Sequence, residues 1–318
     1  MRKVIAILLA LFMSISVAAC GGSASDNIAS GADKANSTAS TEKTDQETTE
    51  ATEETTTETP AEPTPAPVSF EEMTVVDNEE CLIKITGLDP DDLWGYNVKV
   101  YLENRSADKT YMFSLLDSAV NGVEANGVLA TTVAPGKKTN DTITFYSGDD
   151  SLAEIERFTD IELTFRVYDS EDWAADEVAV ETVHVYPYGE ENATVYVREA
   201  QPNDVVLVDN DNVTVIAAGS HTDSIWGFVV ELYLVNKTDK QVMFSAEDVS
   251  VNGYMADPYW ATQVGAGHTA FSSMSWSDST LEENGIESFE EIEMTIRAYD
   301  YNDWSADNLV EETVTYKP

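Results

Sequence analysis

An internal repeat is the feature that most constrains what this chain can fold into. The segment YDSEDWAADEVAVET at 168–182 returns as YDYNDWSADNLVEET at 299–313. Over the longer pair 158–187 and 289–318, 15 of the 30 positions are identical, where chance matching at ordinary composition would give roughly two. We therefore expect two homologous domains, at 68–190 and 200–318, each of a normal single-core size.

Alternation of apolar and polar residues indicates the type of element in both copies. In 96–104 and in 161–168, every second residue is apolar, and the second copy keeps the same phase. A period of two is typical of a half-buried antiparallel strand. Turn signals such as Asn121-Gly122 separate the runs. The pattern predicts an all-β fold of two tandem immunoglobulin-like β-sandwich domains, with brief helical turns only near 151–157 and 280–285.

The first residues have the layout of a secretory signal peptide. Arg2 and Lys3 precede an apolar run that is too short to span a membrane as a helix. The run ends in Val-Ala-Ala followed by Cys20, which resembles the lipobox of bacterial lipoproteins. The resemblance implies cleavage of residues 1–19 and lipidation of Cys20, with two or three acyl chains (palmitate among them) as a firm membrane anchor. The alternative is an ordinary signal peptide that ends beside a chance cysteine.

The segment that follows Cys20 cannot form a packed core. Residues 21–67 lack aromatic side chains and are rich in Thr, Ala, Ser, Pro and acidic residues. Such a composition buries too little apolar surface to offset chain entropy. We expect residues 20–67 to form a disordered acidic stalk that holds the folded part away from a membrane, on the extracytoplasmic side of the cell.

Net charge excludes one class of partner. The chain has 59 acidic and 17 basic residues, a formal net charge of −42. Nucleic acid is therefore excluded as a partner, because binding it needs clustered Lys and Arg. Cys81 is the only cysteine after Cys20, so the folded part cannot form an intrachain disulfide. Its place in an alternating run predicts a small buried side chain.

Aspartates recur at matching positions of the repeated phrase. They could contribute to a weak Ca²⁺ site, since this ion takes six to eight oxygen ligands. The order of an EF-hand loop is missing, however, and the rival interpretation is that Asp side chains close local turns while Trp173 and Trp304 cap the sandwich ends. We favour the turns and expect no cofactor. The candidates are Asp169, Asp172, Asp176, Asp300, Asp303 and Asp307.

Catalytic signatures do not appear in the sequence. The three histidines, His184, His221 and His268, have no histidine counterpart in the other copy. This argues against a repeated triad or zinc site, and we expect surface or strand-face histidines. The motifs of phosphate-binding loops, zinc proteases and serine hydrolases are also missing. The chain is therefore predicted not to be an enzyme.

Aromatic residues provide the candidates for binding. Leu93-Trp94-Gly95 returns as Ile225-Trp226-Gly227, and we interpret both tryptophans as core anchors. The second copy adds four aromatic residues without counterparts. If exposed, they would form a patch able to grip a glycan or a protein, but we favour burial. These four are Tyr254, Tyr259, Trp260 and Trp276.

One stretch of the second copy resembles a known repeat. VNGYMADPYWATQVGAG at 251–267, with the preceding VNKTDKQVMFS, is similar to a repeat of Gram-positive cell-surface lipoproteins. The resemblance implies immunoglobulin-like modules of unassigned function and supplies no active-site residue. The first copy departs from it, because AVNGVEANGVLATTVAPG lacks the DPYW segment.

These observations favour a lipid-anchored extracytoplasmic lipoprotein with a non-catalytic role in binding, adhesion or envelope structure. Its expected partners are the membrane, through the anchor, and a protein or glycan ligand. Two alternatives remain open. One is a solute-binding lipoprotein that serves a transporter, and the other is a glycan hydrolase with paired carboxylates. The sequence leaves the oligomeric state open.

Overall fold

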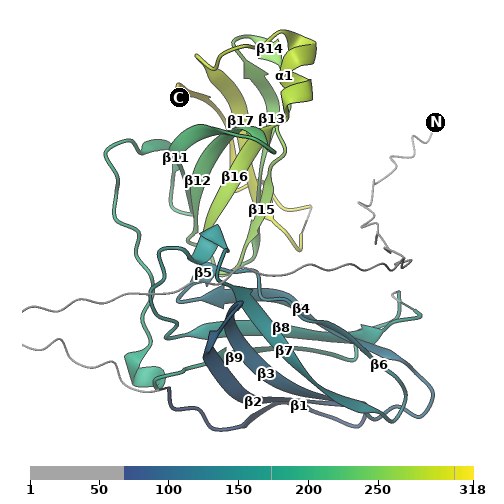
Figure 1. Ribbon diagram of the computed structural model, residues 1–318. Coiled ribbons are helices and arrows are strands. Elements are labelled where there is room, and N and C mark those ends of the chain that lie inside the picture. The colour runs from purple at the N-terminus through teal and green to yellow at the C-terminus, as the bar shows by residue number, and fades with distance from the viewer. Residues whose placement is uncertain (1–67, 173, 304) are drawn as a thin grey trace, which may run out of the picture. The chain divides into compact units, whose positions relative to one another are not determined.

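The computed structural model describes residues 68–172, 174–303 and 305–318. The predicted signal peptide, the lipidated Cys20 and the stalk lie outside the described residues, and so do the expected caps Trp173 and Trp304. The regular secondary structure of the described chain is nearly all β-strand, which confirms the all-β prediction (Figure 1).

No helix in the described part of the chain is both long enough and apolar enough to cross a membrane.

The first repeat pairs its strands into two sheets. One sheet has the order β1-β2-β3-β7, formed by Met73–Asp77, Cys81–Asp92, Gly95–Asn104 and Lys138–Tyr146. The other has the order β5-β4-β8-β9, with β6 also on β4. Its strands are β4 Tyr111–Val120, β5 Val123–Glu124, β6 Ala130–Val133, β8 Ile161–Asp169 and β9 Ala179–Val185. Two 3₁₀ helices follow β7 and β9, namely η1 Asp150–Leu152 and η2 Glu190–Asn192.

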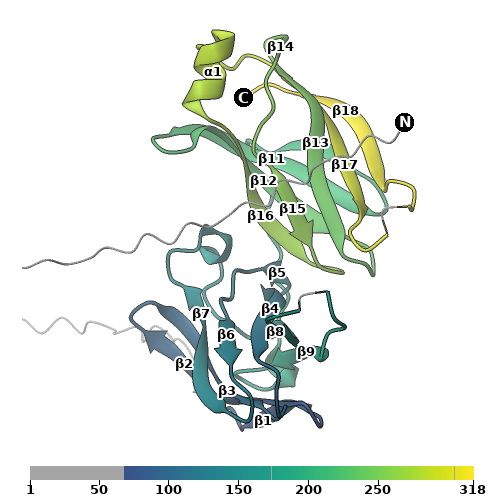
Figure 2. The ribbon, with the colours of Figure 1, turned by 90° about the vertical axis from the view of Figure 1, so that its right-hand side faces the viewer.

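The second repeat has the same strand order. One set of strands runs β10-β11-β12-β16, formed by Val205–Asp209, Val213–Asp223, Gly227–Asn236 and Thr269–Trp276. Because β16 pairs with β5, this set and the β5-β4-β8-β9 strands of the first repeat form one continuous sheet. The other runs β14-β13-β17-β18, with β15 also on β13. Its strands are β13 Val242–Val251, β14 Tyr254–Met255, β15 Ala261–Val264, β17 Ile292–Asp300 and β18 Val310–Tyr316. Helix α1, Asp278–Asn284, lies beside β14 at one end of this repeat (Figures 1 and 2).

The alternating segments fold as the sequence predicts. Segment 96–104 lies within β3, and its apolar positions are buried while none of the intervening ones is. Segment 161–168 lies within β8, where burial alternates without a break. The expected helical turns appear as η1 and α1, with boundaries shifted by a few residues.

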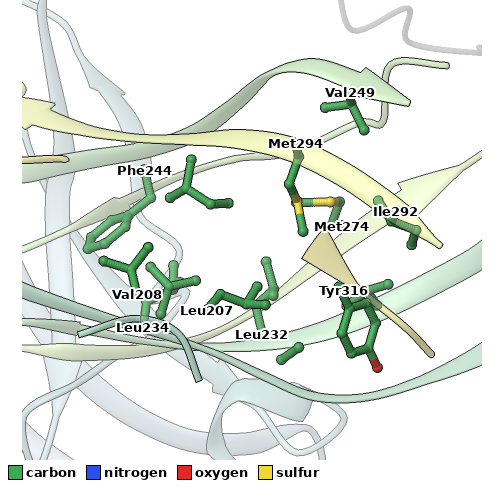
Figure 3. Packing of buried hydrophobic residues seen from close by; sticks show 14 of the residues in the cluster. Leu207, Val208, Leu232, Leu234, Phe244, Val249, Met274, Ile292, Met294 and Tyr316 are labelled. Atoms are coloured by element: carbon green, nitrogen blue, oxygen red, sulfur yellow. The ribbon is translucent and has the colours of Figure 1, made fainter. Parts of the chain in front are cut away.

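Each repeat has its own hydrophobic cluster. One cluster takes its buried residues from 76–185 and the other from 207–316. In the second, Phe244 and Met294 point from one sheet toward Leu232 and Leu234 of the other (Figure 3). Cys81 is fully buried in the first cluster, as expected, and burial raises the pKa of its thiol to about 11.

A buried asparagine at the end of β3 and of β12 ties neighbouring loops together in both repeats. Asn104 Nδ2 donates to the carbonyls of Lys109 and Val133 at 2.8 Å each. Asn236 makes the matching bonds to the carbonyls of Lys240 and Val264, at 2.6 and 3.1 Å. An amide side chain is suited to this position because it can donate twice and accept once in a place closed to water.

Candidate functional site: the aliphatic-tryptophan hairpin tips

Each repeat presents an aliphatic residue and a tryptophan at the tip of a long hairpin. In the first repeat Leu93 and Trp94 join β2 to β3, and they are 84% and 67% exposed. In the second, Ile225 and Trp226 precede β12 and are 78% and 63% exposed. The prediction that both tryptophans anchor the core is therefore wrong. We call these two pairs the hairpin tips.

Aspartate side chains shape both hairpin tips. Asp92 Oδ1 accepts a hydrogen bond of 3.0 Å from the Trp94 amide. Asp223 Oδ1 accepts from the amides of Ile225 and Trp226 at 2.7 and 2.9 Å, and these bonds hold the pKa of Asp223 below its usual value. Bonds of this kind close a turn locally and leave the apolar side chains outside.

A glycine fixes each hairpin tip against the neighbouring strand. Gly95 has φ +141°, and a Cβ on it would lie 1.9 Å from the carbonyl oxygen of Phe145. Gly227 has φ +73°, and a Cβ there would lie 2.1 Å from the carbonyl oxygen of Trp276. Only glycine permits such a close approach of two backbones. The exposed pairs are therefore presented by backbone that is tightly packed.

The aromatic residues special to the second repeat divide between core and surface. Trp276 is fully buried, as the favoured interpretation expects, and its indole nitrogen donates to the Ala256 carbonyl at 2.8 Å. Trp260 is half-buried and donates to Ser272 Oγ at 3.1 Å. Tyr254 and Tyr259 are exposed, against the expectation of burial.

The exposed tyrosines extend the apolar surface at the end of the second repeat. Tyr254 and Tyr259 flank Ala256, whose carbonyl is held by the Trp276 indole. The backbone of Trp276 also adjoins Gly227 at the base of the second hairpin tip. The segment 254–259 and the tip thus both contact one buried residue, Trp276, the segment through its indole and the tip through its backbone.

The six candidate calcium ligands are engaged locally or lie apart. Asp169 and Asp300 are ion-paired with Lys109 and Lys240, at 3.5 and 2.7 Å. Among the described residues, no group of three or more His, Cys, Asp or Glu side chains is placed to hold a metal ion. Asp172 and Asp303 each accept a hydrogen bond from the backbone amide two residues later in the chain. Asp176 and Asp307 are exposed. These contacts favour turns, and calcium binding stays a hypothesis with a direct test below.

One histidine contradicts the expectation of surface positions. His268 is 9% exposed and bridges two carboxylates of the first repeat. Its Nδ1 lies 2.9 Å from Glu124 Oε1 on β5, and its Nε2 lies 3.1 Å from Glu162 Oε2 on β8. Burial opposes the charged imidazolium, but the bonds to both carboxylates outweigh it and raise the pKa of His268 to about 10. At neutral pH this cluster is a charged clamp.

Asp117 adds a second titrating group near the clamp. Burial first, and then the adjacent Glu124 carboxylate, raise the pKa of Asp117 to about 7. The sequence alone gives no signal for this site, because His268 lies 144 residues from Glu124 and 106 residues from Glu162 along the chain. The clamp joins the repeats and has the geometry of a structural ion pair.

Comparisons with known proteins add little to this geometry. No family model matches the sequence, and no curated protein matches it. The crystal structure of the exo-chitosanase CsxA from Amycolatopsis orientalis aligns over 76% of this chain, with 12% sequence identity and a TM-score of 0.21. The aligned part spans 26% of that enzyme. A TM-score at this level supports no argument about fold or activity.

The fold and the exposed residues together define a class of protein. It is an all-β protein in which the same strand order occurs twice, and each copy presents one aliphatic-tryptophan hairpin tip.

Proposed function

We propose that this chain is a lipid-anchored extracytoplasmic lipoprotein whose two immunoglobulin-like domains form a non-catalytic binding or adhesion module. The signal-like residues 1–19 and Cys20 support the anchor, and the all-β fold supports sandwich modules of this type. The ligand is a glycan or protein surface outside the cell.

The single observation that carries this proposal is the repetition of the exposed hairpin tips. Leaving a large aliphatic side chain in water forgoes about 1.5–3 kcal/mol of burial energy. Scattered surface apolar residues are common and need no explanation. Here, however, the same pair stands exposed at the same hairpin position in both repeats, on backbone fixed by glycine. Exposed tryptophans on rigid supports are the kind of residue that dominates binding interfaces.

A binding screen of the purified chain tests the proposal. The chain is applied to a glycan array and to purified cell-wall sacculi, together with Trp94→Ala, Trp226→Ala and the double variant. We expect each single change to weaken binding about tenfold, as for an interface hot spot. Val206→Ala, which shortens an exposed apolar side chain elsewhere, is the matched control and should bind like the unchanged chain.

The non-catalytic part of the proposal has its own test. The purified chain is incubated with the same sacculi and with soluble glycans, and the release of reducing ends is measured. We expect none above the buffer blank. Turnover that a single Asp or Glu substitution abolishes would contradict the proposal and favour the hydrolase alternative.

A further inference from the structure

A cleft in the first repeat combines aromatic walls with an acidic rim. It has a volume of about 610 Å³ and lies beside the base of the first hairpin tip. Its aromatic walls include the rings of Tyr96, Tyr146, Phe158 and Tyr188. The ring of Tyr96 stacks on Phe158 with 4.8 Å between centroids. This stack fixes two of the rings in the wall of the cleft.

The charges of the cleft are mostly negative. Four carboxylates line it against one guanidinium, that of Arg157. Asp92 and Asp149 hold local backbone turns through the amides of Trp94 and Ser151. The side chains of Asp91 and Glu156 are exposed, and neither makes a hydrogen bond or ion pair with another described residue. These two carboxylates are available to an incoming cation.

One cation, the guanidinium of Arg157, already packs on an aromatic ring of the cleft wall. Its Cζ lies 3.7 Å from the centroid of the Tyr188 ring, a cation–π contact within the lining itself. Arg157 and Tyr188 also line a second cavity, of about 520 Å³, which shares Ile155 and Glu156 with the first. The two adjoining cavities suit an elongated ligand better than a compact one.

Tyr96 supplies an independent indication of a ligand. The residue is 8% exposed, and its hydroxyl has no hydrogen-bond partner among the described residues. A buried hydroxyl without a partner is destabilising. The second repeat shows that the fold does not need it, since Phe228 takes this position and stacks on Phe289 in the same way. The hydroxyl is thus a feature of this cleft and not of the sandwich.

We propose that the cleft binds an aliphatic polyamine. The ammonium groups pair with Asp91 and Glu156, and the methylene stem lies against the aromatic rings. One ammonium group donates a hydrogen bond to the Tyr96 hydroxyl. Charge complementarity decides the class of ligand, because an acidic cleft in a chain of net charge −42 repels anions and offers no charge attraction to an uncharged ligand. Polyamine binding uses none of the hairpin-tip side chains, so it goes beyond the proposed function. An experiment can therefore disprove either proposal and leave the other standing.

Isothermal titration of the purified full chain with spermidine tests the proposal. We expect saturable binding at one site. Diaminohexane should bind and hexanediol, its uncharged analogue of the same length, should not. The variant Asp91→Asn/Glu156→Gln should weaken spermidine binding about tenfold, and Tyr96→Phe about threefold, through lost charged hydrogen bonds. Tyr96→Phe reproduces the stack of the second repeat, so the fold is retained.

A matched control separates a site from diffuse counterion binding. Glu283→Gln/Glu287→Gln removes the same charge from exposed positions of the second repeat, and Glu287 is the counterpart of Glu156. This control should bind spermidine as tightly as the unchanged chain. The proposal is overturned if both double variants weaken binding equally, if hexanediol binds as well as diaminohexane, or if Tyr96→Phe changes nothing. These results do not depend on whether the hairpin-tip tryptophans bind a glycan, so the two proposals are tested separately.

Discussion

Gly95 and Phe145 meet so closely that the Phe145 carbonyl oxygen occupies the space of a side chain on Gly95, 1.9 Å from where a Cβ would be. The contact lies at the base of the hairpin that exposes Trp94. Gly227 and Trp276 repeat it in the second copy. The two exposed tryptophans are therefore each followed by a position where backbone packing permits only glycine.

Replacing Gly95 should disturb the first hairpin tip and lower stability. Gly95→Ala forces apart two paired strands, so we expect a loss of about 3 kcal/mol in the free energy of unfolding, at the upper end for overpacking. Gly136→Ala is the control, because its φ of +63° is also strained but nothing lies within 4 Å of the added Cβ. It should cost only about 1 kcal/mol. Denaturant unfolding measures both, and equal losses would show that the close approach is unimportant.

The His268 clamp should stabilise the contact between the repeats. His268→Leu leaves Glu124 and Glu162 facing each other without a cation. Removing one partner of a buried ion pair costs about 3 kcal/mol. His221→Leu removes an exposed histidine, 3.5 Å from Glu231, and should change stability by less than about 0.5 kcal/mol. Unfolding in urea, followed by tryptophan fluorescence, compares the two variants. If the clamp does not contribute to stability, the two variants will have the same urea midpoint of unfolding.

Asp117 should make the chain less stable as the pH rises from 4 to 7. The folded state keeps the proton of Asp117 up to a pKa of about 7, whereas the unfolded chain loses it near pH 3.8. The unfolded state therefore binds fewer protons in this window, and stability falls with rising pH. His268 acts at the other end, since its contribution is complete below 6.5 and disappears as the pH passes about 10.

Thermal melting of Asp117→Asn checks this assignment. The variant lacks the titrating group, so its melting temperature should fall less between pH 5 and 8 than that of the unchanged chain, by a few degrees. If the melting temperatures of the two proteins change equally between pH 5 and 8, the raised pKa of Asp117 is contradicted.

We expect that calcium does not bind at the repeated aspartates. Asp300 is held by Lys240, and Asp303 accepts from the Ser305 amide and hydroxyl, so binding an ion would break existing bonds. We expect the same melting temperature with calcium in excess as with chelator. A ligand at a hundred times its Kd would stabilise the folded state by about 2.7 kcal/mol. A rise of that size, lost in Asp300→Asn but kept in an exposed control such as Glu283→Gln, would restore the calcium hypothesis.

Periodicity was enough to predict the strands but not the exposure of the tips. Alternation over 96–104 and 161–168 identifies β3 and β8 because one face of each strand is buried. A three-residue phrase such as Leu93-Trp94-Gly95 has no period, so periodicity cannot distinguish exposed apolar side chains from buried ones there. The deciding information is the glycine and the hydrogen-bonding aspartate, which together indicate a turn.

The polar sites show a second limit of sequence reasoning. His268 has Lys137 as its counterpart in the first copy, and nothing along the chain connects it with Glu124 or Glu162. Their contact depends on how the repeats meet, with Thr269 of β16 pairing with Val123 of β5. The orphaned hydroxyl of Tyr96 likewise becomes visible only beside the Phe228–Phe289 stack.

The binding role of the hairpin tips is tested most directly by comparing retention of the unchanged chain and of Trp94→Ala/Trp226→Ala on a glycan array and on wall sacculi. We expect saturable retention of the unchanged chain and a loss of about a hundredfold in affinity for the double variant, if the two sites contribute independently. A double variant that folds normally and binds as tightly as the unchanged chain would contradict the account.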